Sequence, residues 1–458
     1  MYRRQSTLVV IVLVALLGLG AVLMNATSYE VWGGVLALPV LALISLPALR
    51  WVLRKDLKHL FNVLAVGFAL KMLGTILRFY VFSKVYGSVA DATYYYEKGS
   101  IIAAGVRSGE RSLWSALPLA RELGFVIRLT GTVLAFTGPT RLGAFLVFGT
   151  FGYWGAVFLV VAACRAVPGL AQRRYALLCC LTPTLVFWPS SLGKEAWILL
   201  CIGVFSLGVA RILNWDRPGF GLLLAVLAGT GIGAVRIHLA VIFVAGAAVA
   251  FVQGILLQPG GSGAQRRGGP AFFAAVSVTV MGVLSYVAAR HLKLGDSNGD
   301  FLSNLDSALN RAATMSETGG SSFTPISTRN PLNWPWAVFR TLTRPLPFDV
   351  SGATSLLPAL ETSLFLVAVV IGYRRLQGLR VTARNAPYVT YCLVTAVLFG
   401  LVFSSFGNLG ILVRQRSLVA AFMVLVLCLP KAPSRAQRYA DRWGPKGTQR
   451  AGAAASRA

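Results

Sequence analysis

Residues 142–164 read LGAFLVFGTFGYWGAVFLVVAAC, an apolar run that contains no charged side chain. A helix needs about 20 apolar residues to cross the ~30 Å hydrocarbon core of a bilayer, so this run is long enough to span a membrane. Similar runs recur along the 458-residue chain, which is 56% hydrophobic and has a mean hydropathy of +0.69. The sequence therefore predicts an all-α polytopic membrane protein.

Short polar segments separate twelve such runs, and we expect each run to be a transmembrane helix. The twelve runs are 7–24, 31–50, 60–83, 142–164, 175–190, 195–213, 219–235, 237–257, 271–289, 356–373, 386–405 and 411–429. This gives a transmembrane domain over residues 1–430 and a basic, disordered cytoplasmic tail over 431–458. The segment 121–138 carries Arg121, Glu122 and Arg128. We interpret it as an interfacial or re-entrant helix, with a full span as the alternative.

The distribution of charge predicts the orientation, because cytoplasmic loops of membrane proteins are enriched in Lys and Arg. With both termini inside, only three of the fifteen acidic residues fall on the inner side, namely Asp56, Asp216 and Asp441. The inner segments between spans are then basic: 50–58, 165–174, 211–217, 258–269 and 374–384. We expect a multi-pass protein of the cytoplasmic membrane, with anionic lipids at its inner face. The outer loops 84–141 and 290–355 would form the active-site face.

The net charge of +28 is explained by these inner segments and the tail, so no nucleic-acid partner is expected. The sequence has no phosphate-binding Walker loop and no dinucleotide-binding fingerprint. Its three histidines and six cysteines show no metal-binding spacing. We expect that no cofactor is required, although a divalent metal stays open.

The first outer loop contains Asp91, followed by Tyr94, Tyr95 and Glu97. Residues 92–106 are expected to form a helix parallel to the membrane, with Asp91 at its start. One interpretation makes Asp91 a helix cap and the tyrosines an interfacial aromatic belt. The other makes Asp91 a catalytic base beside aromatic rings that contact a lipid-borne substrate.

Two further outer turns carry isolated polar residues. In FWPSSLGKEAW, Lys194 and Glu195 open a predicted helix, and in GAVRIHLAV, Arg236 and His238 interrupt a long apolar stretch. Glu195 is explained either as a residue favoured by the helix dipole or as a second catalytic carboxylate. Arg236 either reaches lipid head groups or binds a phosphate with its planar fork. His238 is either a satisfied structural histidine or a substrate ligand.

The fourth outer element is Arg414–Gln415–Arg416, which places two arginines on the side that usually lacks them. Binding of a lipid phosphate is the simplest reason for this exception. Residues two apart on a helix point in different directions, so we expect one of the two, Arg416, to contact phosphate and Arg414 to lie nearer the head groups. Arg344 in the long outer loop is a further candidate for substrate binding.

The order of these motifs resembles the GT-C superclass of integral-membrane glycosyltransferases. Asp91 with Tyr94 and Tyr95 resembles the D-x-x-Y-Y pattern of the first outer loop, which holds the catalytic base in that superclass. Glu195 resembles its second acidic position. Arg236 and the Arg414-x-Arg416 pair resemble its basic residues. Two extra spans precede the motif loop, and Glu195 after Lys194 replaces the more usual Asp. The resemblance implies a polyprenyl-phosphate sugar donor and membrane-parallel helices in the first large outer loop.

Three functions are therefore weighed. The first is an inverting glycosyltransferase that passes a sugar from a polyprenyl-phosphate donor to a lipid-linked or cell-envelope glycan acceptor. The second is an O-antigen or exopolysaccharide polymerase or ligase that uses a polyprenyl-diphosphate oligosaccharide. The third is a transporter or flippase of a lipid-linked anionic substrate. The predicted spans are nearly uncharged apart from Lys71 and Arg78, which disfavours the transporter because transport sites place charges within spans.

Overall fold

The computed structural model describes residues 29–53, 56–88, 91–112, 123–257, 326, 330–350 and 353–432, and within them the chain forms helices and turns but no strand. The main helices are α2 (Tyr29–Val52), α3 (Phe61–Tyr80), α4 (Asp91–Arg107), α6 (Leu123–Thr137), α7 (Arg141–Ala166), α8 (Gln172–Leu181), α9 (Pro183–Phe187), α10 (Lys194–Leu213), α11 (Pro218–Gly233), α12 (Ile237–Leu257), α15 (Trp334–Thr343), α16 (Ala353–Ile371), α17 (Tyr373–Asn385), α18 (Pro387–Phe403), α19 (Leu409–Arg416) and α20 (Ala420–Leu425). The expected spans 7–24 and 271–289, the inner segment 258–269, most of the loop 290–355 and the tail from residue 433 lie outside the described residues.

Five of the described helices are long and apolar enough to cross a membrane: Glu30–Val52, Lys58–Val85, Arg141–Ala166, Lys194–Leu213 and Ile237–Leu256. Two bent pairs raise the number to seven if each pair is one span. The coarse prediction of an all-helical membrane-type protein is thus confirmed. The described residues do not reach the expected twelve spans, partly because α11 and α18, with 16 and 17 residues, are short.

Two of the expected continuous spans are interrupted, 175–190 and 411–429. The run 175–190 is divided between α8 and α9, where Thr182 has an extended conformation and Pro183 opens the next helix. A proline disfavours helical geometry at the residue before it, which explains this break. The run 356–373 ends where the chain bends by 78° between α16 and α17, and the run 411–429 bends by 60° after α19.

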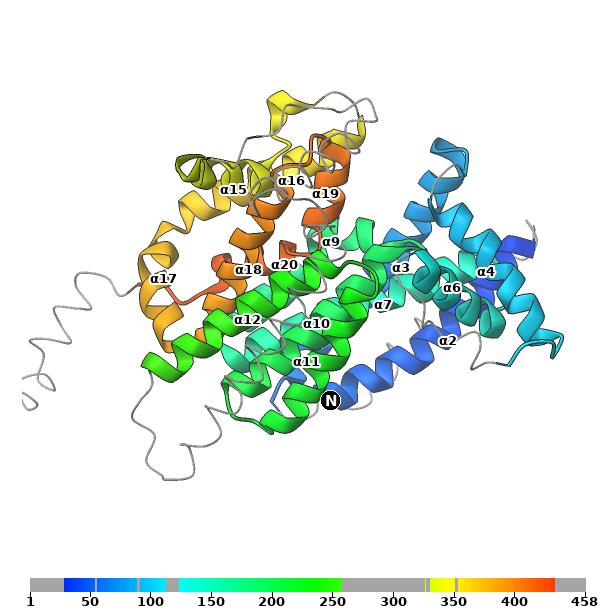
Figure 1. Cartoon of the computed structure of the whole chain (residues 1–458), viewed down its shortest axis with the longest axis horizontal. Coiled ribbons are helices and arrows are strands. Elements are labelled where there is room, and N and C mark those ends of the chain that lie inside the picture. Colours follow the sequence, from blue (N-terminus) through cyan, green and yellow to red (C-terminus); the bar gives the residue numbers. More distant parts are fainter. Residues whose placement is uncertain are drawn as a thin grey trace, which may run out of the picture.

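The first outer loop contains the helix that the sequence predicts. It covers Asp91–Arg107 as α4, and α6 packs along it (Figure 1). The two backbones approach closely at Gly99 and Gly131, where a Cβ on Gly131 would lie 3.1 Å from the carbonyl oxygen of Gly99. With 15 residues, α6 is about 22 Å long and too short to cross the ~30 Å core alone. Its length therefore agrees with the interfacial or re-entrant interpretation of 121–138.

Helix α10 is the centre of the helical bundle, because α7 packs on one side of it and α11 on the other (Figure 1). Glycines permit both contacts. A Cβ on Gly203 would lie 2.3 Å from the carbonyl oxygen of Gly155 in α7, and one on Gly208 would lie 2.5 Å from that of Gly221 in α11. Small residues of this kind let helices in membranes pack at close range. The middle and the second half of α10 are consequently packed closely against both neighbours.

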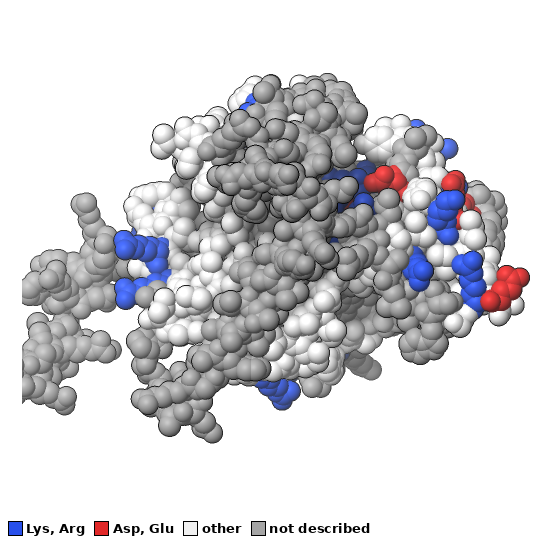
Figure 2. All heavy atoms as spheres, in the orientation of Figure 1, with Lys and Arg blue, Asp and Glu red and all other residues white. Residues whose placement is uncertain are grey.

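The two ends of the long axis differ in their charged side chains. The arginines of α17 have no acidic residue beside them on that helix, and this region lies at one end of the long axis (Figure 1). On the face seen in Figure 2, the acidic side chains appear instead around the other end, near α4 and α6. This separation is in keeping with the predicted difference between an inner basic and an outer mixed face.

Candidate functional site

Glu195 forms the centre of the candidate site. It lies in the first turn of α10 and its side chain is only 1% exposed. One carboxylate oxygen accepts a hydrogen bond from Arg414 Nη2 at 2.8 Å, and the other accepts from Arg236 Nη2 at 3.4 Å. The positive end of the helix dipole also favours a carboxylate at this position. A buried charge is tolerated when it is paired in this way, so Glu195 fixes the two arginines relative to each other.

Arg414 connects this buried carboxylate to an exposed one. The same Nη2 atom that contacts Glu195 lies 3.7 Å from Oδ2 of Asp91, the first residue of α4. The side chain of Asp91 is 62% exposed and that of Arg414 is 29% exposed. Residues predicted from two distant sequence motifs therefore meet at one guanidinium group, with Asp91 on the accessible side.

Arg236 approaches the cluster from the turn between α11 and α12. Its Nη1 donates to the side-chain oxygen of Gln415, a residue that the sequence reasoning quoted only as part of the arginine pair. Burial lowers the pKa of Arg236, against the opposing effect of Glu195, yet a guanidinium group stays protonated in proteins. The charge of half-buried Lys194 interacts with those of Arg236 and Asp91. The site thus brings together cations from α10, α19 and the α11–α12 turn.

Tyr95 lies beside the same charges. Its ring is 1% exposed, and its hydroxyl has no hydrogen-bond partner among the residues that the structure describes. Burial, followed by the charges of Asp91 and Glu195, raises the pKa of Tyr95, so the phenol stays neutral and keeps its proton for donation. Tyr94 is 45% exposed, with its ring centroid 6.1 Å from that of Tyr95.

Three candidates from the sequence lie outside this cluster. Arg416 is 3% exposed and donates to the carbonyls of Leu342 and Arg344 and to the hydroxyl of Thr362. Arg344 forms its own ion pair with Asp349 at 2.6 Å. The ring of His238 packs against Phe403, with a centroid distance of 5.7 Å. The structure therefore brings Arg414, rather than Arg416, to the two carboxylates.

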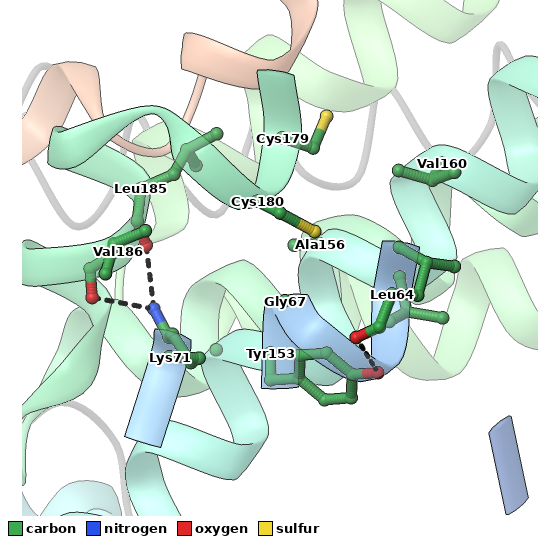
Figure 3. Close-up of a pocket in the computed structure, with 12 residues that line it drawn as sticks. Leu64, Gly67, Lys71, Tyr153, Ala156, Val160, Cys179, Cys180, Leu185 and Val186 are labelled. Atoms are coloured by element: carbon green, nitrogen blue, oxygen red, sulfur yellow. Dashed lines mark hydrogen bonds between the residues drawn. The ribbon is translucent and has the colours of Figure 1, made fainter. Parts of the chain in front are cut away.

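A buried lysine stabilises the turn that leads into Glu195. Pro189 has no N–H, so the carbonyl of Leu185, four residues earlier, lacks a helical partner. Lys71 Nζ donates to this carbonyl at 2.7 Å and to that of Val186 at 3.3 Å (Figure 3). The adjoining cavity has a volume of about 20 Å³, which is enough for about one water molecule. Lys71 therefore has a structural role in supporting the turn.

Glu361 of α16 also stabilises the segment that leads into this turn. Its carboxylate accepts from the backbone N–H of Thr184 at 2.8 Å and from the hydroxyl of Thr184 at 2.5 Å. Because Thr184 lies in the first turn of α9, this carboxylate satisfies donors that every helix start leaves unpaired. Side chains from α3 and α16 thus stabilise the FWPSSLGKE turn, which ends at Lys194 and Glu195 in the candidate site.

Arg78, which the sequence marked only as a charge inside a span, belongs to the surroundings of the site. Its charge interacts with those of Glu195 and Arg414, and its guanidinium lies over the rings of Phe187 and Trp188. These rings follow Arg78 by more than one hundred residues, so only the folded chain shows the association. The aromatic FW pair before Pro189 was the available sequence signal, but it gives no indication of its cationic partner.

The part of the chain that the structure describes contains no group of three or more His, Cys, Asp or Glu side chains arranged to hold a metal ion. The chain also matches no protein-family model, no curated protein and no solved structure. The site is consequently interpreted from its own chemistry: one buried carboxylate, one exposed carboxylate, and a group of cations between them.

Proposed function

We propose that the protein is a membrane glycosyltransferase that uses a sugar linked to polyprenyl phosphate. The observation that carries this proposal is the contact of Arg414 with both Glu195 and Asp91. A phosphate leaving group needs fixed cations, and an acceptor hydroxyl needs a base within reach. An exposed carboxylate beside arginines that are held by a buried one supplies both requirements in one place.

The proposed roles follow from exposure. Asp91, which is the more accessible carboxylate, takes the proton of the acceptor hydroxyl. Arg414 and Arg236 face the donor phosphate, and buried Glu195 positions them. This assigns the phosphate contact to Arg414 in place of Arg416, whose donors are already engaged by protein acceptors. The unpartnered hydroxyl of Tyr95 donates to the donor or the acceptor.

The proposal places the site at the outer face of the cytoplasmic membrane and both termini inside. It extends the observed separation between the arginines of α17 and the mixed charges near α4. A cysteine introduced at Ser108, in the turn after α4, should react with a membrane-impermeant maleimide from outside intact cells. Labelling only from the cytoplasmic side would contradict this orientation.

The activity itself is tested with purified protein in proteoliposomes, supplied with radiolabelled polyprenyl-phosphate sugars and a lipid-linked glycan acceptor. Wild-type protein should transfer label, and Asp91→Asn should transfer it about 10²–10⁴-fold more slowly, the usual loss when a general base is removed. Glu97→Gln is the matched control, because Glu97 is an exposed carboxylate on the same helix. Equal rates for Asp91→Asn and wild type would remove the assigned base.

The same assay separates the alternative functions. Transfer only from a polyprenyl-diphosphate oligosaccharide would identify a polymerase or ligase. Movement of the lipid-linked substrate across the bilayer without a new glycosidic bond would identify a transporter. Neither alternative gains support from Lys71, since its ammonium is bound to the carbonyls of Leu185 and Val186.

A further inference from the structure

Arg78 lies in the last turn of α3, where its guanidinium is surrounded by aromatic rings. Its Cζ atom is 4.8 Å from the ring centroid of Phe187, 4.8 Å from that of Trp188 and 5.7 Å from that of Tyr86. Aromatic faces attract a cation. They hold the guanidinium in place, but they do not provide the carbonyl or carboxylate oxygens that its N–H groups usually bind.

Two nitrogens of this guanidinium, Nε and Nη1, are buried and have no hydrogen-bond partner in the described part of the chain. Buried polar groups in native proteins are nearly always satisfied, and an exception calls for an explanation such as a bound ion or a catalytic role. The fork of an arginine is suited to bind two oxygens of a phosphate. The side chain of Tyr86 hydrogen-bonds to the Arg78 guanidinium, and Nε and Nη1 remain donors without an acceptor among the described residues.

The position of Arg78 relates these donors to the proposed site. Its charge interacts with those of Arg414 and Glu195. Two of the rings, those of Phe187 and Trp188, come from the turn that continues into Lys194 and Glu195. Arg78 is consequently a neighbour of the cations assigned to the donor phosphate.

The charges around the donor phosphate change during transfer. Lys194, Arg236 and Arg414 face the carboxylates of Asp91 and Glu195, which leaves one net positive charge. That matches the single negative charge of a phosphodiester donor. When the sugar leaves, the phosphate becomes a monoester with close to two negative charges at neutral pH. Asp91 loses its negative charge when it takes the acceptor proton, so the cluster then carries two net positive charges, and Arg78 adds a third beside it.

We propose that Arg78 binds the leaving phosphate and stabilises the negative charge that develops on it during transfer. This inference rests on the proposed function. The acceptor oxygen forms a bond to the anomeric carbon and its proton passes to Asp91. The bond between that carbon and the phosphate oxygen breaks, and the electron pair remains on the phosphate. Because the contact strengthens as charge develops, Arg78 acts on the transition state and the product more than on the bound donor.

Binding of two short-chain probes tests this inference without any transfer reaction. Farnesyl phosphate carries the doubly charged head group of the product, and farnesyl methyl phosphate carries the single charge of the donor. Full-length protein in detergent should bind farnesyl phosphate more tightly. Arg78→Gln should weaken that binding about 10- to 100-fold, the usual value of a charged hydrogen bond, and should abolish the preference. Arg111→Gln is the matched control, since Arg111 is an exposed arginine after α4.

Arg78→Lys keeps a charge over the rings but loses the fork, so its affinity should fall between those of wild type and Arg78→Gln. It also carries the test if Arg78→Gln does not fold. Unchanged discrimination between the two probes in folded Arg78→Gln would overturn the inference, and so would wild-type affinity of folded Arg78→Lys for farnesyl phosphate. In the transfer assay, Arg78→Gln should lower kcat with little change in KM for the donor. Wild-type protein that prefers the doubly charged probe but transfers no sugar would refute the proposed function and leave the Arg78 anion site standing.

Discussion

Arg414 and Arg416 lie two residues apart on α19, yet their guanidinium groups enter two different regions of the molecule. The Arg414 region consists of the carboxylates of Glu195 and Asp91, and it is partly open to the outside. The Arg416 region is closed: its hydrogen-bond acceptors are neutral groups of α15, α16 and the chain between them, and the charge of Glu361 interacts with that of Arg416. Arg414 is therefore available to a ligand, whereas Arg416 joins α19 to the segments around it.

The largest effect is expected from Glu195→Gln, which removes the charge between two arginines. Breaking a buried ion pair by removing one partner typically costs about 3–5 kcal/mol of unfolding free energy. Glu195 is 1% exposed and contacts both Arg236 and Arg414, so a destabilisation in this range is expected. Denaturant unfolding in detergent measures it, with the exposed Glu97→Gln as control. An unchanged midpoint would show that the arginines are stable without their carboxylate.

Arg416→Met tests the closed region. The change keeps an apolar stem but leaves the carbonyls of Leu342 and Arg344 without their donor. Each unsatisfied buried group costs about 1–3 kcal/mol, so the free energy of unfolding should fall by about 2–6 kcal/mol. The folded fraction should bind farnesyl phosphate with wild-type affinity. Loss of that affinity in well-folded protein would move Arg416 into the ligand site.

Arg414→Lys tests the region around Arg414. Here the expected loss is in kcat and not in the free energy of unfolding. The positive charge beside Glu195 and Asp91 is retained, so the unfolding free energy should change little. The planar fork is lost, and removal of a preorganised donor commonly lowers kcat by about 10²-fold or more. Steady-state transfer rates measure the effect, and unfolding is followed in parallel. A large loss of stability with a normal kcat would show that Arg414, like Arg416, has a structural role. That result would contradict the distinction between the two regions.

The smallest effect is expected from Thr362→Val, again in the closed region. The hydroxyl of Thr362 accepts from Arg416 at 2.9 Å and donates to the carbonyl of Pro358 at 2.9 Å. Its removal should lower the unfolding free energy by about 1 kcal/mol, and transfer activity should stay unchanged. Ser363→Ala is a control on the same helix, because the hydroxyl of Ser363 donates only a local bond to the carbonyl of Ala359. A change in kcat for Thr362→Val would contradict the separation.

The sequence was most informative where local chemistry decides the structure. Long apolar runs predicted α2, α3, α7, α10 and α12, and the helix at Asp91–Arg107 followed from its start at Asp91. Motif order also selected Asp91, Glu195, Arg236 and Arg414, which meet in the structure. Apolarity alone did not reveal the broken helices, because hydropathy reports burial and not continuity.

Long-range contacts account for most of what the sequence did not predict. The guanidinium of Arg78 contacts the rings of Phe187 and Trp188 only in the folded chain. The same holds for the hydrogen bond from Arg236 to Gln415. The preference for Arg416 over Arg414 depended on the rotation of α19, which its packing against neighbouring helices sets. The break at Pro183 had a local signal, whereas the bend after Arg416 has neither proline nor glycine between α19 and α20.

The bond from Lys71 to the carbonyl of Leu185 also has a consequence for biosynthesis. A lysine near the middle of a helix raises the free energy of membrane insertion by about 2.5–3.5 kcal/mol, and here its acceptor lies 114 residues later in the chain. At the ribosomal rate of about 5–20 residues per second, that acceptor is made roughly 6–23 s after the lysine. During this interval the ammonium group of Lys71 lacks the carbonyl of Leu185 as its hydrogen-bond acceptor. We therefore expect α3 to remain beside the insertion machinery until α9 has been synthesised and can receive it.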